Sequence, residues 1–220
     1  MPALDHLVFG VPDLRAGVRE FADRFGVEPV PGGRHVGRGT ANYLIGLAGG
    51  SYLEIIGPDP DVADPAVAAD AAVAVDAAVD ADAMPFGVGR LAEPRLLTWC
   101  VRPSDLDRCL IDARQRGYDP GEPAAMSRRT ASGDLLSWRL TPDSTPDGGL
   151  LPFLIDWQDS RHPSAGDLPS LELVSLSAVS PDPASVRAAL ATIGLILTVD
   201  PGPEPRLVAV LSGPRGTITL

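Results

Sequence analysis

The alternation of apolar and polar positions repeats three times along the chain. Each copy begins with a short apolar run, passes through a Pro and an Asp into a stretch with apolar residues at helical spacing, and ends at a Gly. The copies span residues 6–26, 98–117 and 175–194. This pattern predicts a strand followed by an amphipathic helix, with the Asp as N-cap and the Gly in the left-handed position after the last turn.

Further apolar stretches follow each predicted helix and indicate additional strands. In the first copy they are residues 27–30, 41–47 and 52–56, with a Gly-Gly hairpin signal between the last two. The later copies repeat the arrangement, at residues 126–129, 134–140 and 151–157, and again at 195–199, 207–211 and 217–220. Each copy therefore predicts a β-α-β-β-β module, and the chain an α+β fold.

The copies also predict how the chain is divided. The first module covers residues 1–58, the second 96–165, and a third, degenerate module 170–220. Residues 59–95 form an insertion and linker, and the part from 59 to 83 contains seven Asp and no Arg. Such acidic low-complexity sequence predicts a solvated insertion without a specific partner.

Composition narrows the class of protein. The net charge is −11 and every one of the 18 basic residues is Arg, as in a GC-rich bacterial genome. The absence of clustered positive charge argues against a nucleic acid partner. No apolar run approaches the roughly 20 residues that span a membrane, and the first residues do not resemble a secretory signal. Cys100 and Cys109 are typical of buried thiols, so we expect a cytoplasmic protein.

Five stretches together resemble one family of proteins. They are LDHLVFGVPDL at 4–14, GGRHVGRGTANYLI at 32–45, YLEIIG at 52–57, SRRTASGDLLSWRL at 127–140 and LLPFLIDW at 150–157. The set resembles the glyoxalase-like domain branch of the vicinal oxygen chelate superfamily. The resemblance implies paired modules whose curled mixed sheet forms a cleft, with the helices on the outside. It also implies a divalent metal held by the first and last strands of each module.

The resemblance places the metal ligands of the first module at His6 and Glu54. Alternation along the strands supports both positions, because successive side chains point to opposite faces. Leu7 and Phe9 should face the helix, which leaves His6 toward the cleft. An imidazole and a carboxylate suit Zn, Ni, Fe or Mn.

The second module departs from the family pattern. Aligning its N-cap with that of the first module puts Thr98 at the His6 position, and Asp156 falls at the Glu54 position on the last strand. Because threonine is a poor ligand for such metals, we predict a three-ligand site of His6, Glu54 and Asp156 with an open position for water or substrate. His35 or His162 could add a further nitrogen.

Other side chains are predicted to bind the substrate. The resemblance puts His35 and Asn42 in the lining of the cleft. Arg129 would orient an anionic group through its guanidinium, and Trp138 would form an apolar wall. Glu54, beside the metal, is also the candidate catalytic base.

Two functions follow from these expectations. The first is a metal-dependent lyase, isomerase or dioxygenase-type enzyme that acts on a small oxygenated substrate. The alternative is a metal-free protein that sequesters a small molecule in the same cleft. The third module would pack against the first two or build the interface of a homodimer.

Overall fold

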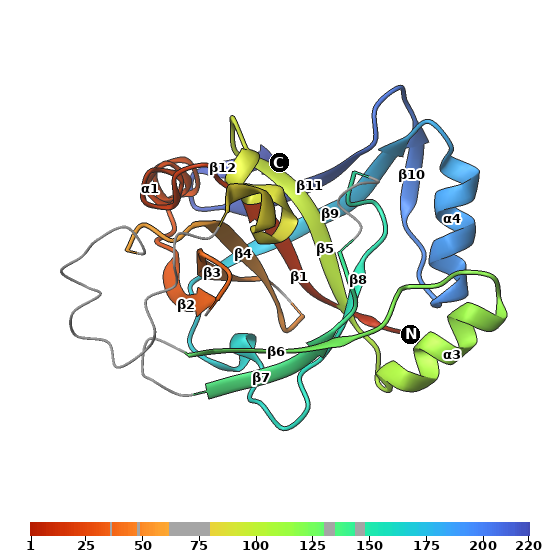
Figure 1. The fold of residues 1–220 in the computed structure, drawn as a ribbon. Helices are drawn as coiled ribbons and strands as arrows, with labels where there is room; N and C mark the ends of the chain where they lie inside the picture. Colours follow the sequence, from red (N-terminus) through yellow and green to blue (C-terminus); the bar gives the residue numbers. More distant parts are fainter. Residues whose placement is uncertain (36, 48, 62–79, 130–134, 144–147) are drawn as a thin grey trace.

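The structure, a computed structural model, describes residues 1–35, 37–47, 49–61, 80–129, 135–143 and 148–220. Its elements repeat one order three times, a strand, a helix and three more strands (Figure 1). The first set comprises β1 (Ala3–Gly10), α1 (Leu14–Phe25), β2 (Val30–His35), β3 (Thr40–Leu47) and β4 (Ser51–Pro58). The second comprises β5 (Arg95–Arg102), α3 (Leu106–Gln115), β6 (Ala124–Arg129), β7 (Leu135–Leu140) and β8 (Phe153–Asp156). The third comprises β9 (Ser170–Ser180), α4 (Pro183–Thr192), β10 (Thr198–Pro201), β11 (Arg206–Gly213) and β12 (Gly216–Thr219).

The three helices begin and end where the sequence pattern predicts. At each start, the side chain of an aspartate accepts a hydrogen bond from the backbone N–H three residues later, which satisfies a donor the helix leaves free. These N-caps are Asp13, Asp105 and Asp182. A glycine with positive φ follows each helix, which an L side chain would resist. These glycines are Gly26, Gly117 and Gly194.

The sheet of twelve strands curls until its first two modules form a ring. Eight strands follow one another in the order β3-β2-β6-β7-β8-β5-β1-β4, and β4 pairs back with β3. The pairing is mixed, since β1 runs parallel to β4 and antiparallel to β5. Figure 1 shows α1, α3 and α4 at the periphery of this sheet. The predicted α+β class, with a curled mixed sheet and outer helices, is confirmed.

The inner and outer faces of the ring bury different side chains. On β1, Leu7 and Phe9 belong to the outer core, where the Phe9 ring lies 5.9 Å from that of Phe21 on α1. Val8, between them, belongs to a separate inner cluster. This alternation is the one that the sequence predicts. It turns every second side chain of β1 toward the interior of the ring.

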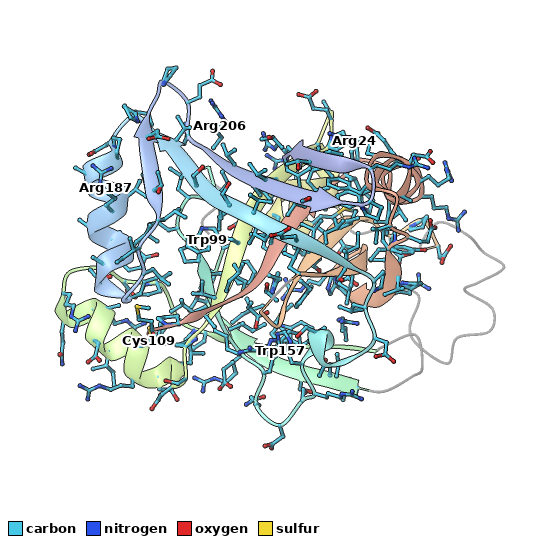
Figure 2. All side chains as sticks on the ribbon, turned by 180° about the vertical axis from the view of Figure 1, so that it is seen from behind. Arg24, Trp99, Cys109, Trp157, Arg187 and Arg206 are labelled. Atoms are coloured by element: carbon cyan, nitrogen blue, oxygen red, sulfur yellow. The ribbon has the colours of Figure 1, made fainter. Side chains whose placement is uncertain are left out.

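The third module packs against the first two. Its strand β9 runs parallel to β3, pairing Ser170 with Gly46 and Leu171 with Leu47. Seen from behind, β9 and β11 lie across β1 and β5, with Trp99 in the core beneath them (Figure 2). Arg116, next to α3, donates a hydrogen bond of 2.8 Å to the carbonyl of Thr192 at the end of α4. One outer core therefore serves all three modules.

The second strand differs from its prediction. The sequence places a strand at 27–30, whereas β2 begins at Val30 and continues to His35. Gly32 therefore lies inside a strand. A Cβ there would clash with Asn42 Oδ1 on β3, so the absence of a side chain allows the two strands to approach.

The acidic insertion is described only at its ends. Residues 62–79 lie outside the described part of the chain, and the remainder contains two short 3-10 helices, η1 (Ala81–Ala83) and η2 (Pro85–Arg90). A third, η4 (Pro163–Ala165), lies between the second and third modules. No helix among the described residues has the length and apolar character needed to cross a membrane.

Candidate functional site

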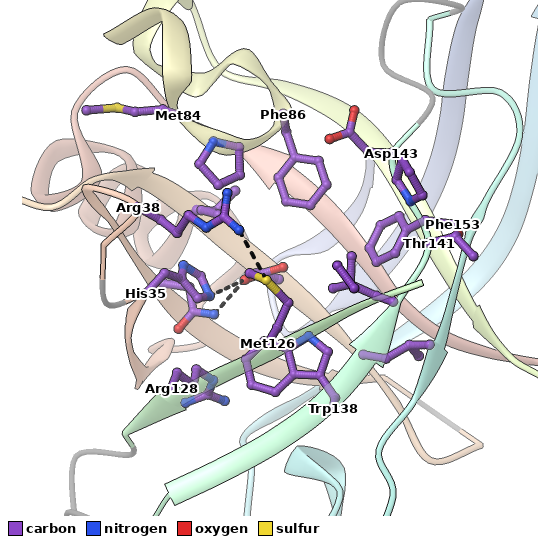
Figure 3. A pocket seen from close by; sticks show the side chains of 18 of the residues that line it. His35, Arg38, Met84, Phe86, Met126, Arg128, Trp138, Thr141, Asp143 and Phe153 are labelled. Carbon is purple, nitrogen blue, oxygen red and sulfur yellow. Dashed lines mark hydrogen bonds and ion pairs between the residues drawn. The ribbon is translucent and has the colours of Figure 1, made fainter. Parts of the chain in front are cut away.

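A cavity of about 610 Å³ opens into the interior of the ring (Figure 3). Polar side chains line one end of it. They are His6, His35, Asn42, Glu54 and Arg128. Aromatic and apolar side chains line much of the remainder, together with the charged side chains of Arg38, Asp82, Arg90, Glu122 and Asp143. The aromatic and apolar side chains include Phe86, Met126, Trp138, Phe153, Ile155 and Trp157. The cavity can therefore hold the polar group of a small molecule at one end and its apolar body at the other.

Glu54 lies at the centre of the polar end, with only 6% of its surface exposed. His6 Nε2 lies 3.7 Å from Oε2 of its carboxylate, and His35 Nε2 lies 3.7 Å from Oε1. Asn42 Nδ2 donates a hydrogen bond of 2.5 Å to Oε1. Three strands supply this group, β1, β3 and β4, together with the last residue of β2. The structure thus brings together His6, His35, Asn42 and Glu54 of the predicted site.

His6 is held by a neighbour in sequence. Its Nδ1 lies 2.7 Å from the carboxylate Oδ1 of Asp5, and its ring stacks on that of Tyr52 with 4.7 Å between centroids. A carboxylate acceptor fixes the tautomer with the proton on Nδ1. His6 Nε2 is therefore left with a lone pair that faces Glu54 and the cavity.

A hydrogen-bond partner on Nδ1 also orients the ring of His35. Its Nδ1 lies 2.9 Å from the hydroxyl of Thr40, so that Nε2 is the nitrogen directed at Glu54. Burial lowers the pKa of His35 below its usual value, although the charge of Glu54 acts in the opposite direction. The neutral ring is favoured, and a neutral imidazole is the form that binds a metal.

Asp5 is the residue of this site that the sequence analysis missed. Its carboxylate is fully buried, and Oδ2 accepts hydrogen bonds of 3.0 Å from Trp157 Nε1 and from His162 Nε2. Arg102 lies 3.4 Å from the same oxygen. Burial alone would raise the pKa of Asp5, but the hydrogen bonds from His162 and His6 outweigh it and hold the pKa well below its usual value. Asp5 is thus a charged anchor for His6.

The structure does not bring Asp156 to the cavity. Phe153, Ile155 and Trp157 line the cavity from β8 and the residue after it, so Asp156 points to the opposite face. Its carboxylate accepts a hydrogen bond of 2.9 Å from the backbone N–H of Gln158. Thr98 on β5 is buried and does not line the cavity either. Neither β5 nor β8, both fully described, presents an imidazole or carboxylate to the cavity.

The role predicted for Arg129 stays a prediction, and its neighbour Arg128 lines the cavity. The side chain of Arg129 lies outside the described part of the structure, while its backbone pairs with Leu135. Arg128 lines the cavity with only 3% of its surface exposed, and its guanidinium donates a hydrogen bond to the carbonyl of Gly32. Trp138, on the next strand, forms part of the wall as predicted.

A family model described as a glyoxalase-like domain matches residues 4–194. The chain belongs to the glyoxalase-like domain family. The resemblance inferred from the five sequence stretches is thereby confirmed. A comparison with curated proteins found no match.

Solved structures are similar to this glyoxalase-like chain at low sequence identity. A hypothetical protein from Staphylococcus aureus is 14% identical, with a TM-score of 0.66 over 93% of this chain and 88% of that one. A methylmalonyl-CoA epimerase from Mycobacterium tuberculosis is 15% identical, with a TM-score of 0.41 over 74% and 91%. A variant of the Streptomyces coelicolor epimerase, in complex with 2-nitronate-propionyl-CoA, is 20% identical, with a TM-score of 0.42 over 73% and 97%. The first of these shows the fold alone.

The family implies a divalent metal, and two groups of side chains can be tested for it. Asp5, His6 and Cys100 form a group whose potential ligand atoms all lie within 4.8 Å of one another. This group fits poorly, because Asp5 is already engaged by its hydrogen bonds and burial raises the pKa of the Cys100 thiol well above its usual value. A thiol must lose its proton to bind a metal.

The second group consists of His6, His35 and Glu54, which are spread more widely. Its chemistry fits better, because both imidazoles have Nδ1 engaged and Nε2 directed at one carboxylate. Two imidazoles and a carboxylate with open positions suit a first-row metal. The 3.7 Å between each Nε2 and its Glu54 oxygen is too long for a good hydrogen bond. The two separations are to different oxygens of Glu54, and the three residues do not bring one ligand atom each within 4.8 Å of one another, so their side chains would have to draw together around an ion.

Proposed function

We propose that this glyoxalase-like protein is a metal-dependent isomerase, lyase or dioxygenase-type enzyme that acts on a small oxygenated substrate. One observation carries the proposal. Glu54 lies between two imidazole nitrogens, His6 Nε2 and His35 Nε2, at 3.7 Å from each. Each ring is turned toward it by a partner on its other nitrogen, Asp5 for His6 and Thr40 for His35.

His6, His35 and Glu54 would hold a divalent ion such as Zn, Ni, Fe or Mn. When bound, such an ion supplies a Lewis acid that polarises an oxygen of the substrate. Asp5 fixes the direction in which His6 offers its lone pair, and Asn42 fixes one oxygen of Glu54 by its hydrogen bond. These outer contacts restrict the ligand side chains before any ion or substrate arrives.

The remaining residues of the cavity determine what happens to the substrate. Oε1 of Glu54 accepts the hydrogen bond from Asn42, so Oε2 is the oxygen left to take a proton from a bound molecule. Trp138, Phe153 and Trp157 limit the water beside this group, since all three line the cavity and the Phe153 ring lies 5.4 Å from that of His6. Exclusion of water strengthens the electrostatic interactions inside the cavity and protects a reactive substrate.

Metal-free binding is the second candidate function. It is favoured by the second module, in which β8 presents Phe153 and Ile155 to the cavity where the family would place a ligand. A protein that only sequesters its ligand needs the cavity and its apolar wall, but no affinity for an ion. The two functions therefore differ in one measurable property.

Metal content and affinity distinguish the two functions. The full chain is purified without chelator and analysed for Zn, Ni, Fe and Mn, then stripped with chelator and titrated with each ion by calorimetry. Glu54→Gln and His6→Ala should lose the ion. Asp156→Asn is the matched control, because this carboxylate faces away from the cavity. No affinity for any of the four ions in the unaltered protein would rule out the metal-dependent enzyme and support sequestration.

A further inference from the structure

Two arginines line the cavity without a carboxylate partner among the described residues. They are Arg128 on β6 and Arg38, which lies between β2 and β3. The third arginine of the cavity lining, Arg90, is paired with Asp82, and Arg34 on β2 is paired with Asp59 at 2.5 Å. The chain as a whole has a net charge of −11 and therefore offers carboxylates in excess. A guanidinium group that is buried at a cavity without a carboxylate partner, as that of Arg128 is, indicates that a ligand supplies the anion.

Arg128 is the more deeply buried of the two arginines, so its charge has the greater need of a counter-ion. It is 3% exposed, its guanidinium donates to the Gly32 carbonyl, and burial lowers its pKa. A charge removed from water costs free energy unless another charge compensates it. Glu54 attracts the guanidinium but forms no ion pair with it within 4.0 Å. A carboxylate in the cavity would match the fork of donors that guanidinium presents.

Arg38 reaches the same cavity from the outside. Its Nη2 donates a hydrogen bond of 3.4 Å to the thioether sulfur of Met126, and Figure 3 shows the side chain extending over the centre of the cavity. Thioether sulfur is a weak acceptor, so an incoming anion would readily replace it. Because Arg38 is exposed, it can meet a ligand at the mouth of the cavity.

Acidic side chains at the rim do not cancel these charges. Asp82 and Glu122 also line the cavity, but they pair with Arg90 and Arg114. Figure 3 shows Asp143 across the cavity from Arg128. The cavity therefore combines the proposed metal ligands with two positive charges, that of Arg128 beside them and that of Arg38 at the mouth.

The rest of the wall is suited to a ring. The Trp138 and Trp157 rings lie 5.2 Å apart, and those of Phe86 and Phe153 lie 5.6 Å apart. Trp138 Nε1 is buried and has no acceptor among the described residues, so an oxygen of the ligand could accept its hydrogen bond. A cavity of about 610 Å³ is typical of sites for small organic molecules.

We propose that the cavity binds a small aromatic carboxylic acid, with its carboxylate at Arg128 and Arg38 and its ring against Trp138 and Phe153. The proposal names the substrate class of the site and rests on the proposed function only for what then happens to the acid. Binding itself requires no metal. The acid group would be held beside Glu54 and His35, so that an oxygen near it lies within reach of the proposed ion.

The test uses the chelator-stripped full chain and measures tryptophan fluorescence. Benzoate, phenylacetate and 3-phenylpropionate are each titrated beside the corresponding neutral amide. At least one acid should bind at least about tenfold more tightly than its amide, because a hydrogen-bonded charge is lost in the amide. Arg38→Gln and Arg128→Gln should each weaken that acid, the latter by about tenfold or more. Arg34→Gln is the matched control, since Arg34 is paired with Asp59 and does not line the cavity.

Equal binding of acids and amides would overturn the proposal, as would no binding of any acid at millimolar concentration. So would unchanged acid binding in Arg38→Gln, which alters an exposed side chain and should not disturb folding. Titration of the same samples with metal ions measures metal affinity and so tests the proposed function separately. Acid binding without metal affinity would support the acid site and contradict the metal-dependent enzyme. Metal affinity without a preference for acids would support the enzyme and contradict the acid site.

Discussion

The carboxylate of Asp5 lies 2.7 Å from Nδ1 of His6, and both side chains are buried. Adjacent residues of a regular strand point to opposite faces. Here the pairing of β1 with β5 shifts in register between Leu4 and His6. This irregularity accompanies the contact between two neighbours that regular alternation would separate.

Asp5→Asn should weaken the site without closing the cavity. The amide keeps the size of the carboxylate but no longer offers two charged acceptors to His6, His162 and Trp157. Loss of such an outer contact lowers metal affinity by about 10- to 100-fold. We expect that loss by calorimetry, with a decrease of about 1–3 kcal/mol in the free energy of unfolding. Unchanged metal affinity would show that Asp5 serves only the fold.

Gly32→Ala should displace Asn42. The added Cβ would clash with Asn42 Oδ1 and lie 2.9 Å from Leu44 Cγ, so that the strand or both side chains must move. Overpacking of this kind costs about 1–3 kcal/mol, and the hydrogen bond from Asn42 to Glu54 should be lost. Denaturant unfolding and metal titration measure the two effects. Gly166→Ala is the control, because its nearest neighbour, the Pro163 carbonyl, is at 3.6 Å. Equal stability of the two variants would contradict the prediction.

Thr98→Val should stabilise the protein. Thr98 is fully buried, and its hydroxyl has no partner among the described residues. Removal of an unsatisfied buried hydroxyl, with the shape kept, should raise the free energy of unfolding by about 1 kcal/mol. Metal affinity should stay the same, since Thr98 does not line the cavity. A fall in stability would mean that the hydroxyl has an acceptor after all.

The two cysteines should react at different rates with iodoacetamide. Cys100 is fully buried and Cys109 partly buried, and burial raises the pKa of both thiols. Because the thiolate is the reactive form, native protein should be labelled slowly and at Cys109 alone. Labelling of both should follow unfolding in urea. Mass spectrometry of peptides from each sample reports the site, and early labelling of Cys100 would argue against its position in the core.

Stability should depend on an ion pair between α3 and β7 at neutral pH but not in acid. Arg139 donates hydrogen bonds of 2.6 and 3.2 Å to the carboxylate of Asp107, and these lower the pKa of Asp107. A carboxylate with a depressed pKa contributes stability above its unfolded value, about 3.9, and loses it as the pH falls through the folded value. Asp107→Asn should therefore melt at a slightly lower temperature than the unaltered protein at pH 7, and this difference should shrink as the pH falls below about 3.9. A difference in melting temperature that persists in acid would show that the ion pair is not its cause.

Local patterns in the sequence suffice to predict the three helices and the part of the site that the first module supplies. Asp13 and Gly26 mark the ends of α1 by backbone chemistry that acts within a few residues. His6 and Glu54 reach the cavity because alternation along a single strand decides which face they occupy. Neither inference depends on how distant parts of the chain meet.

The remainder of the site depends on register and on contacts between modules. The side that Asp156 faces depends on the register of β8, because a shift of one residue turns a side chain to the opposite face. Arg128 is buried where β6 approaches β2, which the sequence of either strand does not reveal. Asp5 depends on the irregular pairing of β1 with β5 and on Trp157 and His162, more than 150 positions away.

That last separation has a consequence for synthesis of the protein. While the ribosome is still translating the second module, Asp5 has already been synthesised, but its hydrogen-bond donors Trp157 and His162 have not. The nascent strand carries a charged group that the finished molecule encloses completely. Completion of the site must therefore await nearly three quarters of the chain, and a product interrupted before residue 157 would leave His6 without its oriented anchor.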